Sequence, residues 1–181
     1  MTDIPLICHP QSDAHGVESL TVTISHGQSG EIGIIYRVAG ALETLEIATP
    51  AAGDRVEGLW KSTCFELFVC RFEDSSYLEY NFAPSGQWAA YQFASYRDAM
   101  SELETGAPSI EVKQNGNILT LSASLHLPVA WRACKLSAGI SAVVATKNGD
   151  ISYWAVAHPP SKPDFHHRDC FAVQLEARSA P

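Results

Sequence analysis

Two glutamates and an asparagine stand within the largely apolar β-patterned runs of one short stretch, where carboxylates can bind hydroxyl groups or transfer protons. The stretch contains two β-patterned runs, Thr63–Cys70 and Tyr77–Ala83, separated by a polar turn sequence, which predicts an antiparallel hairpin. A symmetric loop places Glu66 opposite Asn81, and Glu79 lies two residues before Asn81. Because strand side chains alternate between faces, we expect all three on one face of the hairpin and an apolar set on the other.

Three interpretations of this polar face are open at this point. It can be a solvated surface, the floor of a ligand-binding site, or the carboxylate pair of a glycoside hydrolase, since diagonal neighbours on a sheet lie several Å apart. The sequence itself offers no sign of the raised pKa that a general acid at Glu66 or Glu79 would need. It also contains no nucleophile-elbow, P-loop, dinucleotide-binding or HExxH motif.

Tryptophans near the hairpin favour a binding site. Trp60 and Trp88 flank it, and Trp154 lies on a later strand. Trp88 is in phase with Gln92 and Trp154 with Ser152, so we expect both rings on the face of mixed polarity. A ring beside carboxylates and amides suits a sugar, because it covers C–H faces while fixed polar groups take the hydroxyls. The alternative is that these tryptophans belong to the core.

A proline-punctuated loop near the C-terminal end, Ala155–Phe171, is rich in polar side chains. Such loops at the ends of β-sandwiches are common places for binding. We expect His166 to belong to a site or to latch the loop to the hairpin. A zinc site built from His158, Asp164, His166 and His167 is an alternative, but their spacing matches no recognised metal motif.

The elements that must position these residues are strands. About ten or eleven short β-patterned segments with regular turn signals, and no convincing long helix, predict an all-β fold of two antiparallel sheets packed face to face, a β-sandwich. Asn-Gly pairs predict two further hairpins, and the first segment is expected to be an edge strand or arm. The other expectations are a third strand at Leu42–Ile47, a surface loop at Ser95–Pro108 and a last strand at Cys170–Glu176.

Length and charge limit the function classes. A chain of 181 residues is expected to form a single domain, 1–181. The net charge of -8 and the lack of any Lys/Arg run argue against nucleic acid or anionic membrane as partners. No apolar stretch is long enough for a membrane span, and the first residues lack signal-peptide features. Five scattered cysteines without a CxxC pair favour reduced thiols and a cytoplasmic location.

The chain resembles the bacterial DOMON-like domain proteins, relatives of carbohydrate-binding module family 9. The matching stretches are Leu59–Val69, Tyr77–Phe93, Tyr96-Arg97 and Ser152–Phe171, in that order. The resemblance implies an antiparallel β-sandwich of the jelly-roll kind whose relatives bind sugars or haem. Haem-binding members use a methionine and a histidine, whereas this chain has only Met1 and Met100. Sugar-binding members hold the sugar between tryptophan rings, with a calcium site nearby. No cluster of calcium ligands is evident in this sequence.

The leading hypothesis is therefore a non-enzymatic, cytoplasmic binding module for a carbohydrate-like small molecule, with no cofactor. The alternatives are haem or tetrapyrrole binding, a glycan-processing enzyme that uses Glu66 and Glu79, and a structural domain. The sequence does not predict the oligomeric state. The candidate ligand-binding residues are Trp60, Glu66, Glu79, Asn81, Trp88, Tyr96, Arg97, Trp154, His158, Asp164 and His166.

Overall fold

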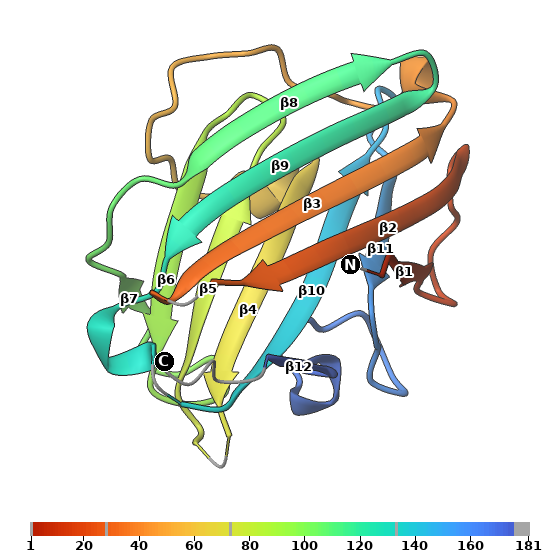
Figure 1. Ribbon diagram of the computed structural model, residues 1–181. Helices are drawn as coiled ribbons and strands as arrows, with labels where there is room; N and C mark the ends of the chain where they lie inside the picture. Colours follow the sequence, from red (N-terminus) through yellow and green to blue (C-terminus); the bar gives the residue numbers. More distant parts are fainter. Residues whose placement is uncertain (1, 28, 73, 133, 176–181) are drawn as a thin grey trace.

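The computed structural model describes residues 2–27, 29–72, 74–132 and 134–175. Within these ranges the chain forms antiparallel strands, and its helical segments are single 3-10 turns (Figure 1). The all-β antiparallel prediction is therefore confirmed. The strands are β1 (Ile4–Cys8), β2 (Val17–His26), β3 (Glu31–Gly40), β4 (Cys64–Arg71), β5 (Tyr77–Phe82), β6 (Trp88–Phe93), β7 (Ser101–Glu102), β8 (Ser109–Asn115), β9 (Ile118–His126), β10 (Leu136–Ala145), β11 (Ile151–Ala155) and β12 (Val173–Leu175).

The strands form one continuous sheet that curls over itself. Their order is β7-β6-β5-β4-β10-β11-β1-β2-β3-β9-β8, with β12 beside β10. Figure 1 shows β8, β9, β3 and β2 crossing over β6, β5, β4 and β10. Strand β1 joins the two halves because Ile7 pairs with Ala155 of β11 and Pro5 pairs with Thr21 of β2. The described strands thus do not divide into two separate sheets, and the expectation that the first segment is an edge strand is wrong.

The two halves of the sheet bury their inner faces against each other. Phe65 and Leu67 of β4 point inward and are fully buried. The ring of Tyr36, on β3 of the opposite half, lies 4.9 Å from that of Phe65, centroid to centroid. The Tyr36 hydroxyl donates a hydrogen bond of 2.7 Å to the backbone carbonyl of Glu66. The core therefore fixes β4 in a position that sends the Glu66 side chain to the outer face.

Tyr36→Phe should lower the free energy of unfolding by about 1 to 2 kcal/mol, because the Glu66 carbonyl loses a buried donor. Urea denaturation monitored by tryptophan fluorescence measures this change. Tyr153→Phe, at a half-buried position, is the matched control and should change stability by less than about 0.5 kcal/mol. Equal effects at both positions would show that the Tyr36 bond does not stabilise the packing of the two halves.

Both hairpins predicted from Asn-Gly pairs are present. Asn115 pairs with Ile118, so the two-residue loop between β8 and β9 is Gly116-Asn117, and Gly116 has a φ of 59°. Gly149, between β10 and β11, has a φ of 89°. Positive φ is accessible to glycine because it lacks a Cβ, which explains why these turns close where the sequence predicts them.

Two predicted strands differ from the structure. Leu42–Ile47 is not a strand: Leu42–Thr44 is a 3-10 turn, and only Leu45 makes a bridge, to Thr146. A 3-10 turn places residues three apart on one side, and this arrangement buries both Leu42 and Leu45. The last strand, predicted at Cys170–Glu176, is limited to β12, and Glu176 lies outside the described residues. No helix in the described part of the chain is long and apolar enough to cross a membrane.

Candidate functional site

The carboxylate-bearing face of the hairpin is covered. Glu66 pairs with Asn81 and Phe68 with Glu79, so the predicted register is confirmed. Strand β10 lies on the other side of β4 and places Ser141 opposite Glu66. The exposed fractions of Glu66, Glu79 and Asn81 are 3%, 5% and 0%. These values exclude the solvated-surface interpretation.

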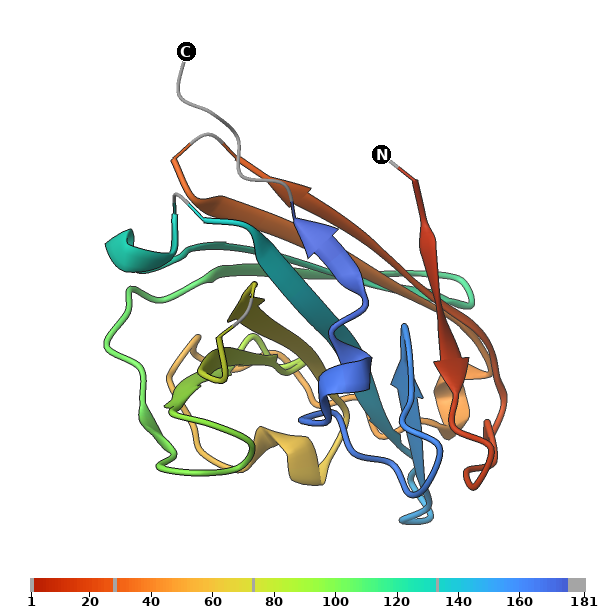
Figure 2. The same ribbon diagram turned by 90° about the horizontal axis from the view of Figure 1, so that it is seen from below.

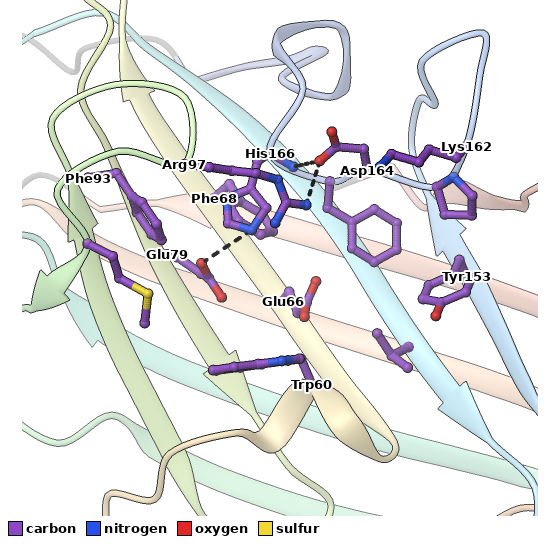
Figure 3. Close-up of a pocket in the computed structure, with 14 residues that line it drawn as sticks. Trp60, Glu66, Phe68, Glu79, Phe93, Arg97, Tyr153, Lys162, Asp164 and His166 are labelled. Atoms are coloured by element: carbon purple, nitrogen blue, oxygen red, sulfur yellow. Dashed lines mark hydrogen bonds and ion pairs between the residues drawn. The ribbon is translucent and has the colours of Figure 1, made fainter. Parts of the chain in front are cut away.

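Three segments from distant parts of the chain cover this face. Figure 2 shows the 3-10 turn η2 (Leu59–Lys61), the loop after β6 and the loop after β11 on the side of β4 and β5 that faces away from β2 and β3. They enclose a cavity of about 500 Å³, within the usual range for small-molecule sites (Figure 3). Its lining consists of Trp60, Glu66, Phe68, Glu79, Phe93, Arg97, Met100, Val143, Tyr153, Lys162, Pro163, Asp164, Phe165 and His166.

Each carboxylate has one hydrogen-bond donor among the described side chains. The Ser141 hydroxyl donates to Glu66 Oε2 at 2.9 Å, and Asn81 Nδ2 donates to Glu79 Oε1 at 2.7 Å. Figure 3 shows both carboxylates pointing into the space between Trp60 and Arg97. The face is therefore rich in hydrogen-bond acceptors that are available to a ligand.

The environment of the two glutamates favours their neutral forms. Burial raises the pKa of Glu66, and the charge of Glu79 raises it further, against a smaller opposing effect of the Ser141 hydrogen bond. Burial likewise raises the pKa of Glu79, opposed by the Asn81 hydrogen bond. Two carboxylates that repel each other in a buried site share protons, so we expect the pair to hold a proton near neutral pH.

Asp164 anchors the loop after β11 to the loop after β6. Its carboxylate accepts a short hydrogen bond from the Tyr96 hydroxyl and forms an ion pair with Arg97 Nη2 at 2.8 Å. The backbone N–H of His166 donates to the same carboxylate at 3.3 Å. Although burial opposes ionisation, the hydrogen bonds from Tyr96 and Arg97 keep the pKa of Asp164 below its ordinary value. The two loops are thus joined through a charged carboxylate.

A chain of hydrogen bonds joins the same loops to the hairpin. The backbone N–H of Arg97, a residue with a φ of 53°, donates to the Tyr77 hydroxyl oxygen at 3.1 Å. The Tyr77 hydroxyl and His166 Nδ1 are 2.8 Å apart and share a hydrogen bond. The other ring nitrogen of His166, Nε2, lies 3.9 Å from Glu79 Oε2. Burial lowers the pKa of His166 to about 4, so the ring is neutral near pH 7.

The structure brings most of the predicted site residues together. Trp60, Glu66, Glu79, Arg97, Asp164 and His166 line the cavity. Asn81 and Tyr96 do not line it, but they hydrogen-bond to Glu79 and Asp164, which do.

The expectation that Trp88 and Trp154 lie on the polar face is wrong. Trp88 pairs with Phe82, and both belong to the inner core. Trp154 lies in the same core, and its Nε1 donates to Ser152 Oγ at 2.9 Å. The polar neighbour in phase, Ser152, is therefore the hydrogen-bond partner of a buried indole and does not mark a solvated face.

His158 also lies outside the cavity lining. Its Nε2 is 2.7 Å from the backbone carbonyl of Ile7, and its ring packs edge-on against His9. His158 therefore connects the loop after β11 to the end of β1 and does not contribute to the site described above.

Sequence reasoning missed several site residues. Tyr77 could have been found, because it shares the alternation of Glu79 and Asn81. Ser141 lies opposite Glu66 only because β10 pairs with β4, a contact between segments 75 residues apart that leaves no local signal. The additional lining residues are Phe68, Phe93, Met100, Val143, Tyr153, Lys162, Pro163 and Phe165.

The described residues supply one open histidine nitrogen to the cavity and no metal cluster. Met100 and His166 both line the cavity, but His166 Nδ1 hydrogen-bonds with Tyr77, which leaves Nε2, 3.9 Å from Glu79 Oε2, as the ring nitrogen of His166 that could bind an iron atom. In the described ranges, no three His, Cys, Asp or Glu side chains are grouped so that they could hold a metal ion.

Comparisons with known proteins support the fold. No protein-family model matches the chain, and no curated protein matches it either. Among solved structures, the chain is similar to a crystal structure described as a "putative carbohydrate-binding protein" from Bacteroides uniformis ATCC 8492. The two share a TM-score of 0.68 at 15% sequence identity, over 95% of this chain and 84% of that chain. At this level of identity, the similarity shows that the chain has the same fold as that Bacteroides protein.

Proposed function

We propose that this protein is a non-enzymatic binding module for a carbohydrate-like small molecule, related to the DOMON-like domains. One observation carries the proposal: a cavity of about 500 Å³ has two buried carboxylates on its floor and an accessible indole on its wall. Sugars need fixed polar groups for their hydroxyls and a flat apolar surface for their C–H faces. The fold shared with the Bacteroides protein is consistent with such a role.

Each residue type has a separate task in this proposal. Glu66 and Glu79 accept hydrogen bonds from hydroxyl groups, and the Arg97 guanidinium donates to a sugar oxygen. Trp60, which is 39% exposed, covers the C–H face of the ring. The walls are preorganised, because Asp164 and His166 already fix the two loops over the floor.

Trp60→Ala should weaken ligand binding by about tenfold or more, because the indole supplies the only extended apolar surface proposed to contact the sugar face. Calorimetric titration with a panel of mono- and oligosaccharides measures the affinity. Phe72→Ala is the matched control, since Phe72 is 58% exposed and lies outside the cavity lining. If the wild type binds no sugar at millimolar concentration, the proposed function is wrong.

A glycan-processing enzyme is the second candidate, favoured by the raised pKa values of Glu66 and Glu79. A carboxylic acid that stays protonated near neutral pH beside a second carboxylate has the properties of a general acid. Turnover of aryl glycosides, lost in both Glu66→Gln and Glu79→Gln, would establish this activity. Binding without turnover would leave the non-enzymatic proposal in place.

The cellular setting is proposed on the sequence alone. We propose a single-domain, cytoplasmic protein that binds neither nucleic acid nor membrane. Its five cysteines are free thiols in the structure. Cell fractionation tests the location, and size-exclusion chromatography with light scattering measures the oligomeric state.

A further inference from the structure

We infer that the ligand of this cavity carries a primary ammonium group, as an amino sugar does, and that this group binds between Glu66 and Glu79. The inference rests on the proposed function and specifies its ligand class. The position follows from the register, since Glu66 on β4 and Glu79 on β5 are diagonal neighbours on one face. Diagonal side chains of this length can contact the same small group.

The floor of the cavity has more acceptors than donors. Ser141 and Asn81 each supply one hydrogen bond, to Glu66 Oε2 and Glu79 Oε1, and both carboxylates point into the cavity. Two cations line the same cavity: Arg97 forms its ion pair with Asp164 instead, and the Lys162 side chain is exposed. A ligand that donates several hydrogen bonds therefore fits the floor better than one that accepts them.

The side-chain oxygen of Asn81 is a further acceptor on this face that lacks a donor. Its side chain is fully buried, and no described residue donates a hydrogen bond to its Oδ1 atom. Asn81 lies on the same face as the two carboxylates, opposite Glu66 and two residues after Glu79. A buried acceptor without a donor is costly, and Asn81 itself does not line the cavity, so a proton held by the neighbouring Glu66 in the free protein is the donor expected here.

An ammonium group meets these requirements better than a hydroxyl. It offers three N–H donors and a positive charge, whereas a hydroxyl offers one donor and no charge. Two buried carboxylates repel each other, and a cation between them removes that repulsion as a shared proton does in the free protein. Ammonium binding should therefore displace a proton from the pair.

The rest of the cavity favours a ligand that has a single positive charge, directed toward the glutamates, on a polar ring. The Trp60 indole can cover the ring face and also attract a cation. Arg97 lines the cavity and Lys162, which is exposed, adds a second positive charge to the lining, which disfavours a ligand with several positive charges such as a polyamine. A hexosamine with its ammonium group toward the glutamates and its hydroxyl groups toward Arg97 complements both sides of the cavity.

Calorimetric titration near pH 7 with glucosamine, glucose and N-acetylglucosamine tests the inference. We expect glucosamine to bind at least about tenfold more tightly than the two neutral sugars, and this preference to disappear in Glu66→Gln/Glu79→Gln. Repeating the titration in buffers with different ionisation enthalpies should show that the wild type releases protons on binding glucosamine. Glu111→Gln, at an exposed glutamate remote from the cavity lining, is the matched control and should keep the preference.

The outcomes separate the inference from the proposed function. Neutral sugars that bind as tightly as glucosamine would overturn the ammonium inference and leave carbohydrate binding intact. A glucosamine preference that persists in the double variant would place the ammonium elsewhere and also overturn the inference. No binding of any of the three sugars at millimolar concentration would refute both. The proton-release measurement uses the wild type, so it stands even if the double variant folds poorly.

Discussion

Asp164→Ala should lower the free energy of unfolding by about 2 to 3 kcal/mol and abolish ligand binding. The substitution removes the acceptor for the Tyr96 hydroxyl, the Arg97 guanidinium and the backbone N–H of His166. Removing one partner of a buried ion pair usually costs about 3 to 5 kcal/mol, and the lower figure here reflects the half-exposed Arg97 side chain. Without Asp164, the two loops lose the contact that holds them over the carboxylates.

Chemical denaturation and calorimetric titration of the same preparation measure both effects. Asp169→Ala is the matched control, because Asp169 lies on the same loop but is 61% exposed and pairs only weakly with His167. It should change stability by less than about 0.5 kcal/mol and leave binding intact. If Asp164→Ala behaved like the control, the loops would be held by contacts other than the Asp164 carboxylate.

Glu66→Gln/Glu79→Gln should stabilise the protein, and the gain should grow as the pH rises. Burial raises the pKa of both glutamates above the ordinary value of 4.5, and the charge of Glu79 raises that of Glu66 further, so the folded state binds more protons than the unfolded state above that pH. Folding stability from these two groups is therefore present below pH 4.5 and is lost as the pH rises through the raised pKa values. Glutamine keeps the acceptors for Ser141 and Asn81 without the charge.

We expect the double variant to equal the wild type within about 0.5 kcal/mol near pH 4.5 and to exceed it by about 2 kcal/mol or more at pH 8, since each unit of pKa shift corresponds to about 1.4 kcal/mol. The comparison needs both proteins at each pH. His166 acts in the opposite direction, because its pKa is lowered to about 4 and its contribution is lost as the pH falls below 6.5. Urea titrations across this range supply the data. If the difference in stability between the two proteins did not change with pH, the pKa values of Glu66 and Glu79 would not be raised in the folded state.

Local patterns predicted the parts of the fold that local geometry controls. Strand alternation correctly predicted that Glu66, Glu79 and Asn81 share one face of the sheet, and the two Asn-Gly pairs correctly predicted two hairpins. The pairing of β4 with β10 and the joining of two halves by β1 depend on contacts between distant segments, for which a single sequence has no local signal. This is why the curled sheet, and Ser141 beside Glu66, were not predicted.

The tryptophans show a second limit of sequence reasoning. Trp154 was placed on the polar face because Ser152 is in phase with it, yet Ser152 is itself buried and hydrogen-bonds to the Trp154 indole. Trp60, by contrast, lies in a 3-10 turn, where strand alternation does not apply, and it reaches the cavity. Alternation is informative about direction along a strand, but it does not distinguish a polar residue in the core from one at a site.

Tryptophan indole NMR tests most directly whether a ligand binds over Glu66 and Glu79 on the outer face of the hairpin. The chain has four tryptophans, and isotopically labelled protein reports each indole N–H as a separate signal. Titration with glucosamine, or with any sugar that binds, should shift the Trp60 signal and leave the core signals of Trp88 and Trp154 unchanged. Shifts at Trp88 or Trp154 with none at Trp60 would contradict the assigned site, and no shift at Trp60 with any sugar at millimolar concentration would contradict carbohydrate binding.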